Sequence, residues 1–182
     1  GDLARLACKR QPKMHAIAAD FTLEMMRVGI SRLARASPSS AAITWLGADA
    51  AHLPFGDNYF DAVVSGFLLR NVADLSSVLH EQYRVLKPGG RFVALDTSPH
   101  PRSFLSPLLQ FYLHVVIPTI GRLIVWQSEP YKYLPDSTDT FLEPESLADQ
   151  LHEVGFESVF YERKMFGTIA IHAADKPKPE KS

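Results

Sequence analysis

The chain has 182 residues, of which 46% are hydrophobic and 21% are charged, and its formal net charge at pH 7 is −1. This length supports one domain with a hydrophobic core. The near-neutral charge argues against a nucleic-acid partner, because a general nucleic-acid-binding protein needs a basic surface. A single cysteine, Cys8, excludes a disulfide within the chain and fits a reducing compartment.

The hydrophobic pattern predicts helices that alternate with strands along the chain. We expect helices over residues 2–10, 22–36 and 144–154, and another helix that Asp74 caps at its N-terminus. We expect strands over residues 15–19, 43–46, 60–65, 92–95, 159–161 and 168–172. This order implies an α/β fold, with a mostly parallel sheet, helices on both faces and an antiparallel pair at the C-terminal end.

Residues 83–91, with the sequence YRVLKPGGR, predict the end of a helix, a tight turn and the start of a strand. Pro88 has no amide proton and cannot continue a helix. Gly89 and Gly90 allow the backbone angles that a sharp reversal requires.

Polar residues stand at the expected carboxyl ends of three strands. They are Asp20, Asp49 and Ser65. Ligands of mostly parallel α/β sheets bind beyond the carboxyl ends of the strands. A single aspartate there is usually a helix cap or a turn residue, but three such positions together favour a ligand site.

Residues 104–126 form a mostly apolar segment of 23 residues, which is long enough to span a bilayer. Arg122, Pro107 and Pro118 interrupt it, so we expect kinked helices with an apolar surface and not a spanning helix. This surface either covers the sheet or forms a lid over a lipidic substrate.

Several motifs in order resemble a known family. They are Asp20-Phe-Thr, Gly47-Ala-Asp-Ala50, Leu53-Pro-Phe55, Leu69-Arg-Asn-Val72, the Pro-Gly-Gly turn and Tyr131-Lys-Tyr-Leu-Pro-Asp-Ser137. Together they resemble the class I S-adenosylmethionine (SAM)-dependent methyltransferases, and in particular the ubiquinone/menaquinone biosynthesis C-methyltransferases.

The resemblance implies a Rossmann-like sheet in which the first, central strand and most of the glycine loop lie upstream of Gly1. It implies a methyltransferase domain over residues 1–173, truncated at its N-terminus, with an apolar lid insert at residues 102–142. We expect residues 174–182, which are charged and contain proline, to form a disordered tail.

The resemblance also implies the cofactor, SAM, and the residues that bind it. Asp20 matches the ribose-binding carboxylate, and Asp49 with the Ala50 amide matches the adenine contact. The other cofactor positions that it implies are Gly1, Asp2, Phe21, Met26 and Ser65. For Met26, a core position on an apolar helix face is an equal alternative.

The implied substrate is a demethylated polyprenyl quinol, demethylmenaquinol or the ubiquinol precursor. A neutral quinol carbon is a poor nucleophile, so the site must favour the phenolate. Arg70 is the candidate for stabilising it. Asn71 either orients the ring or caps the next loop, and the base is Asp49, His52 or a water held by Arg70. Phe67, Tyr131 and Tyr133 are expected to line the quinone pocket, and no metal ligand is expected.

Two other functions stay open. One is methylation of another lipid-like small molecule, against which residues 131–137 argue. The other is a non-catalytic quinone- or lipid-binding fragment. We expect a cytoplasmic protein with peripheral contact at the inner face of the membrane, and self-association into a homo-oligomer is a further expectation.

Overall fold

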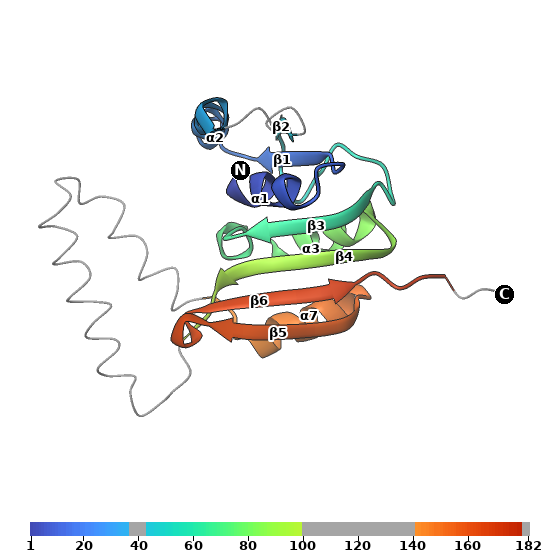
Figure 1. Cartoon of the computed structure of the whole chain (residues 1–182). Helices are drawn as coiled ribbons and strands as arrows, with labels where there is room; N and C mark the ends of the chain where they lie inside the picture. The colour runs from blue at the N-terminus through green and yellow to red at the C-terminus, as the bar shows by residue number, and fades with distance from the viewer. Residues whose placement is uncertain (37–42, 100–140, 180–182) are drawn as a thin grey trace, which may run out of the picture.

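The computed structural model describes residues 1–36, 43–99 and 141–179 and shows alternating helices and strands (Figure 1). The helices are α1 (Asp2–Arg10), α2 (Leu23–Ala36), α3 (Leu75–Val85) and α7 (Pro144–Val154), with short 3₁₀ turns η2 (Leu69–Asn71) and η4 (Met165–Gly167). The strands are β1 (Ala16–Asp20), β2 (Ile43–Gly47), β3 (Phe60–Gly66), β4 (Leu86–Thr97), β5 (Glu157–Lys164) and β6 (Ile169–Asp175). The α/β fold predicted from the sequence is therefore confirmed.

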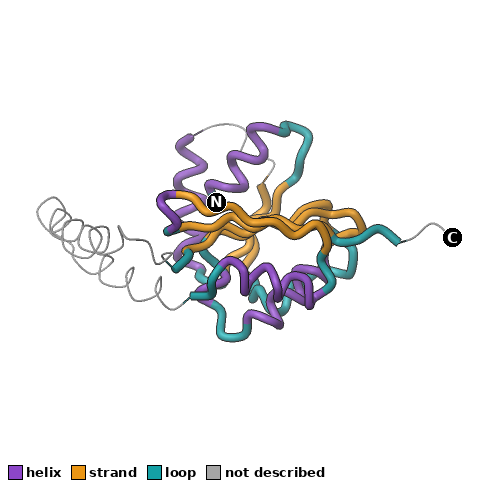
Figure 2. The backbone as a smooth tube through the Cα atoms, turned by 90° about the horizontal axis from the view of Figure 1, so that it is seen from below, coloured by secondary structure: helices purple, strands orange, loops and turns teal. Residues whose placement is uncertain are grey.

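These strands form two sheets. β1 pairs in parallel with β2, and the second sheet has the order β3-β4-β6-β5. β3 and β4 are parallel, whereas β6 is antiparallel to both β4 and β5, as the sequence predicted for the C-terminal pair. Figure 2 shows helices on both sides of the strands.

β1 and β3 run in the same direction in Figure 1, but they belong to different sheets. Neither strand has a second partner among the described strands, and Val64 of β3 is 54% exposed. The resemblance places a further strand between these two, and the described part of the chain contains none there.

Helix α1 contacts both sheets. It packs against β1 and β2, where Cys8 is buried beside Ile43. At the other sheet, a Cβ placed on Gly66 at the end of β3 would lie 2.8 Å from Cδ1 of Leu3. Helix α1 therefore bridges the two sheets.

The main core lies between the four-stranded sheet and helices α3 and α7, which also pack against each other. Its fully buried members include Leu79 of α3, Leu151 of α7 and Phe92 of β4. Phe156 joins them and stacks edge-on against Tyr83, with ring centroids 5.0 Å apart. This core fixes the position of the strand ends that carry the polar residues.

Strand β4 begins at Leu86, six residues before the expected start at Phe92. The register with β3 shifts between Phe60 and Ala62, so residues 87–90 bulge out of the ladder. Gly89, at a φ of 78°, donates a hydrogen bond to the Lys176 carbonyl at 2.7 Å. The Pro-Gly-Gly segment is thus an irregular part of β4. It bulges on the edge that faces β3, and its other edge pairs with Lys176, which follows β6.

The expected disordered tail is wrong for residues 174–176. Ala174 and Asp175 belong to β6, and the Asp175 carboxylate accepts two hydrogen bonds from Arg91, at 2.7 and 2.9 Å. Lys176 donates to the Tyr83 carbonyl at 2.8 Å and lies 4.4 Å from the centre of the Tyr83 ring. These contacts bind the charged residues to the sheet and to α3.

The expected helix ends are confirmed at two positions. Asp74 accepts a hydrogen bond from the Ser77 amide at 3.0 Å and so caps α3. Gly155 ends α7 in the left-handed region, with a φ of 106°. The apolar segment at residues 104–126 lies outside the described residues, and no helix within those residues is long and apolar enough to cross a membrane.

Gly155→Ala should destabilise the intact protein by about 1–2 kcal/mol, because an L-residue is strained in the left-handed region. Urea unfolding would measure the loss. Gly56→Ala is the control, since a Cβ there meets nothing within 4 Å. Equal stability of the two variants would contradict the role of Gly155.

Candidate active site at the strand ends

Asp20 and Asp49 lie close together where β1 and β2 end. The Ala48 amide, just after β2, donates to the Asp20 carbonyl at 3.2 Å. The Asp20 carboxylate accepts a hydrogen bond from the Thr22 amide at 2.8 Å, so it also orders the start of α2. The structure therefore brings the two carboxylates predicted for the ribose and the adenine to one edge.

The Asp49 side chain starts a tight turn. Its carboxylate accepts a hydrogen bond from the Ala51 amide at 2.9 Å and lies 3.5 Å from Nδ1 of His52. The bond from Ala51 holds the pKa of Asp49 below its ordinary value, and His52 acts in the same direction. Asp49 and His52 are both exposed, so each is accessible to a ligand at this edge.

The remaining predicted cofactor residues differ in their surroundings. Met26 is buried, and a Cβ on Gly47 would lie 3.5 Å from its terminal methyl, so it packs beneath the end of β2. Phe21 is 81% exposed. Ala50 packs against the main core.

Gly1 and Asp2 lie at the start of α1. A Cβ on Gly1 would come within 2.4 Å of the tip of the Trp45 ring, so a larger residue there would displace that ring. Asp2 forms an ion pair with Arg5 at 3.6 Å. Gly1 therefore lies beside β2, and Asp2 pairs within its own helix; their contact with the cofactor stays a prediction.

Ser65 and Arg70 form a second group, at the end of β3. Ser65 is buried, and its hydroxyl has no hydrogen-bond partner among the described residues. The Arg70 side chain, in η2, is only 12% exposed. Its Nε and Nη1 also lack a hydrogen-bond partner within the part of the chain that the structure describes. Buried polar groups are usually hydrogen-bonded, so these atoms indicate a place for a polar ligand group.

Asp96, near the end of β4, is the acidic partner of Arg70. The Asp96 carboxylate lies 3.8 Å from Nε of Arg70, which is an ion pair without a hydrogen bond. It accepts hydrogen bonds from the Thr97 amide at 2.8 Å and from the Arg70 amide at 3.3 Å. Burial raises the pKa of Asp96, and the two amides and the Arg70 guanidinium oppose that rise.

Sequence reasoning missed Asp96. The available signal was an acidic residue near the carboxyl end of a strand, the same signal that singled out Asp20 and Asp49. It was overlooked because the expected strand ended one residue earlier, at Leu95.

Asn71 and Phe67 shape the loop that carries Arg70. The Asn71 side-chain amide donates to the Phe67 carbonyl at 2.8 Å, so the structure has Asn71 bracing this loop. The Phe67 amide donates to the Leu95 carbonyl at 2.7 Å, and its ring lies 5.1 Å from the Arg70 guanidinium carbon. Phe67 and Arg70 thus face the same space at the end of the sheet.

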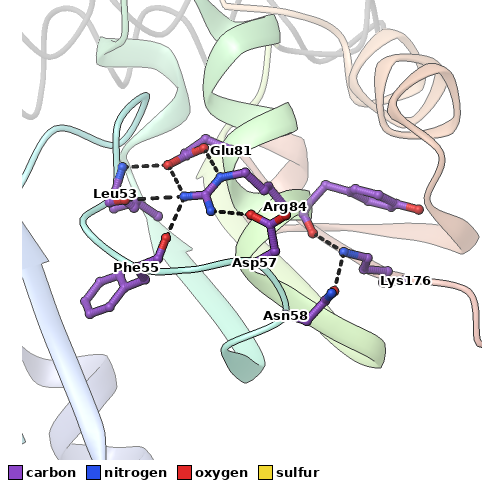
Figure 3. A network of polar contacts seen from close by, with 8 residues as sticks. Leu53, Phe55, Asp57, Asn58, Glu81, Arg84 and Lys176 are labelled. Atoms are coloured by element: carbon purple, nitrogen blue, oxygen red, sulfur yellow. Dashed lines mark hydrogen bonds and ion pairs between the residues drawn. The ribbon is translucent and has the colours of Figure 1, made fainter.

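A further polar network, also missed from the sequence, holds the segment after Asp49 (Figure 3). Glu81 and Arg84 of α3 bind Leu53, Phe55 and Asp57. An acid and a base three residues apart on a helix usually form a solvated surface pair. Only the folded structure shows that this pair binds a distant loop.

Two predicted substrate residues, Tyr131 and Tyr133, lie outside the described residues, as does nearly all of the expected lid at residues 102–142. His172 is buried, and its Nε2 lies 2.9 Å from the Pro144 carbonyl, which agrees with a structural role. Within residues 1–36, 43–99 and 141–179 no group of three histidine, cysteine or acidic side chains is placed to hold a metal ion.

Solved structures of methyltransferases share this fold. A phosphoethanolamine N-methyltransferase from Haemonchus contortus has a TM-score of 0.68 at 16% identity, over 96% of this chain and 46% of that one. A SAM-dependent methyltransferase from Aquifex aeolicus has a TM-score of 0.63 at 16% identity, over 96% and 75% of the two chains. The fold, with polar residues at the strand ends, defines the Rossmann-like class I methyltransferase type.

The ubiE/COQ5 methyltransferase family model matches residues 1–176, and the chain belongs to that family. It is 45% identical to a ubiquinone/menaquinone biosynthesis C-methyltransferase of Desulfotalea psychrophila, over 94% of this chain and 68% of that protein. A demethylmenaquinone methyltransferase of Thermus thermophilus is 40% identical, over 97% and 79%. The bovine mitochondrial 2-methoxy-6-polyprenyl-1,4-benzoquinol methylase is 38% identical, over 89% and 49%. The resemblance inferred from the sequence is confirmed.

Asp96→Asn should change how stability depends on pH. A carboxyl whose pKa is raised by folding adds stability that is present below its unfolded pKa and is lost as pH rises through the folded value. Wild-type stability should therefore include a contribution that falls as pH rises above the ordinary value of 3.8. The variant should lack this contribution.

Urea unfolding between about pH 3.5 and about pH 6.5 would measure the effect. Asp61→Asn is a control of opposite sign, because a hydrogen bond from Lys87 lowers the pKa of Asp61. That variant should lose a contribution that is present above the unfolded pKa. An unchanged slope in Asp96→Asn would contradict the prediction.

Proposed function

We propose that this chain transfers a methyl group from SAM to a ring carbon of a demethylated polyprenyl quinol. Its membership of the ubiE/COQ5 methyltransferase family, over residues 1–176, carries this proposal. Three relatives act in quinone synthesis by their names, and one of these names specifies a polyprenyl benzoquinol. Demethylmenaquinol is the preferred substrate in this proposal, and the ubiquinol precursor is the alternative.

The described residues fit SAM in two ways. Asp20 and Asp49 supply carboxylates at neighbouring strand ends, which suits a ribose diol and an adenine amino group. Ser65 supplies a buried hydroxyl that has no partner among the described residues, near the place expected for the methionine part. When bound, SAM supplies an electrophilic sulfonium methyl group.

Arg70 is the residue that we assign to the quinol oxygen. Loss of the hydroxyl proton places negative charge on that oxygen and raises electron density at the neighbouring ring carbon. That carbon forms the new carbon–carbon bond as the methyl–sulfur bond breaks, and it then loses its own proton. A guanidinium whose buried Nε and Nη1 have no hydrogen-bond partner among the described residues favours the charged oxygen.

The environment of Arg70 supports this assignment. The Asp96 carboxylate lies 3.8 Å away. Only 12% of the Arg70 side chain and 3% of the Asp96 side chain are exposed, so the guanidinium has limited access to water. A charged group acts more strongly where water is excluded. Phe67 lies beside Arg70 and offers an apolar surface to the quinol ring.

The Arg70 assignment predicts a separation of binding from chemistry. Arg70→Ala should lower turnover on the quinol by about 10²–10³-fold, the usual effect of losing one transition-state donor. Its affinity for SAM should be nearly unchanged. Asp20→Ala should do the reverse and weaken SAM binding by about 1.5–3 kcal/mol.

Isothermal titration with SAM and turnover assays on demethylmenaquinol and the ubiquinol precursor would test both variants of the intact protein. Normal turnover in Arg70→Ala would mean that this residue only braces its loop. Unchanged SAM affinity in Asp20→Ala would remove Asp20 from the site.

We also propose a cytoplasmic protein that works at the inner membrane surface, because a polyprenyl quinol resides in the bilayer. Support comes from the sequence alone: residues 104–126 are largely apolar, Arg102 precedes them, and Arg122 lies near their C-terminal end. Shallow insertion of apolar side chains, with cations toward anionic headgroups, suits this composition. Self-association stays a prediction.

Polar substitution of Leu108, Leu109 and Leu113 should reduce co-sedimentation of the intact protein with anionic liposomes. It should also reduce activity on long-tailed quinols while sparing a short-tailed analogue, because only the long tail requires the bilayer surface. Loss of all activity together with the thermal transition would instead assign these leucines to the core.

A further inference from the structure

The loop at residues 49–58 has little regular structure of its own. Its internal backbone contacts are the isolated bridge between Asp49 and His52 and a hydrogen bond from the Phe55 amide to the Leu53 carbonyl at 2.8 Å. It nevertheless carries Asp49, which the proposed function assigns to the adenine, and Ala50, whose amide the resemblance places at the same contact. Its shape must therefore be fixed by contacts from elsewhere.

Helix α3 supplies several of those contacts. The Arg84 guanidinium donates to the Phe55 carbonyl at 2.8 Å, to the Leu53 carbonyl at 3.3 Å and to the Asp57 carboxylate at 2.7 Å (Figure 3). Glu81 accepts a hydrogen bond from the Leu53 amide at 2.7 Å. Both backbone polar groups of Leu53 are thus bound to the same pair of side chains.

Glu81 also orients Arg84. Its two carboxylate oxygens accept hydrogen bonds from Nε and Nη2 of Arg84, both at 2.7 Å. Such a two-point contact fixes the plane of the guanidinium, which a lysine ammonium cannot do. Side-chain exposure is 13% for Glu81 and 34% for Arg84, so solvent competes only in part for these bonds.

The far end of the loop is attached to the same helix. The Asn58 amide donates to the Arg84 carbonyl at 3.0 Å, and the Tyr59 amide donates to the Val85 carbonyl at 2.8 Å. Lys176 donates to the Asn58 side chain at 3.0 Å. The segment from Leu53 to Tyr59 is therefore bound to α3 at several points. Asp49 lies four residues before Leu53, the first residue of that segment.

We propose that Arg84, oriented by Glu81, is a positioning residue that holds the loop at residues 49–58 in the conformation that binds the adenosyl part of SAM. This inference rests on the proposed function. Arg84 acts through the Leu53 and Phe55 carbonyls and does not itself contact the cofactor. Loosening these bonds allows Asp49 and Ala50 to depart from the binding geometry.

The test compares variants of the intact protein by titration with SAM and by steady-state kinetics. Arg84→Ala should bind SAM about tenfold or more weakly and raise KM for SAM, because a misplaced binding loop loses affinity. At saturating SAM, kcat should stay within about twofold, since bound cofactor restores the loop. Arg84→Lys should fall between wild type and Arg84→Ala.

Two further variants isolate the contacts that matter. Asp57→Asn keeps both carbonyl contacts and should bind SAM within about twofold of wild type. Arg91→Ala is the matched control, because it removes another two-point arginine–carboxylate pair, to Asp175, that forms no hydrogen bond or ion pair with residues 49–58 within the described part of the chain. It should leave SAM affinity unchanged.

Hydrogen exchange of residues 49–58 without SAM gives a readout that is independent of the reaction. It should accelerate in Arg84→Ala and not in Arg91→Ala. Wild-type SAM affinity in a folded Arg84→Ala, or equal weakening in Arg91→Ala, overturns the inference and leaves the proposed function standing. If Arg84→Ala does not fold, unchanged affinity in Arg84→Lys overturns it. A wild-type protein that binds no SAM overturns the proposed function itself.

Discussion

The alternation of side chains along β4 is the constraint on which both the sheet and the site depend. Phe92, Ala94 and Asp96 occupy every second position, and all three are buried. Because successive side chains of a strand point to opposite faces, the register that buries Phe92 in the core also buries the Asp96 carboxylate. The core packing of this strand therefore places a negative charge inside the protein.

A buried carboxylate requires partners, and the loop after β3 supplies them. Its Arg70 contributes both a backbone amide and a guanidinium to Asp96, while Phe67 ties the loop to the Leu95 carbonyl. An unpaired buried charge costs several kcal/mol, so neither residue of this pair is easily replaced alone. Arg70 thus stabilises the buried Asp96 carboxylate in the folded protein before any ligand binds.

The sequence predicted the elements well where local signals agreed with the final packing. The alternation of helices and strands, the Asp74 cap and the Gly155 stop depend on neighbouring residues, and all three are confirmed. The predicted start of β4 was wrong because the residues from Lys87 to Gly90 have the local sequence of a turn. In the structure, backbone hydrogen bonds of Gly89 and Gly90 with Lys176 extend the strand. That pairing joins residues far apart in the chain, and no local pattern reports it.

The site shows the same division. Strand-end carboxylates can be read from the sequence because the strand and the residue that follows it are contiguous. Glu81 and Arg84 could not be assigned in this way, because their partners at residues 53–57 lie 27 or more positions earlier in the chain. On α3 they are half-buried, and Glu81 lies three residues from Val78 and four from Val85, which are buried in the core. One helix therefore packs the core and holds the loop at residues 49–58 through neighbouring side chains, so that correct packing of α3 also positions that loop.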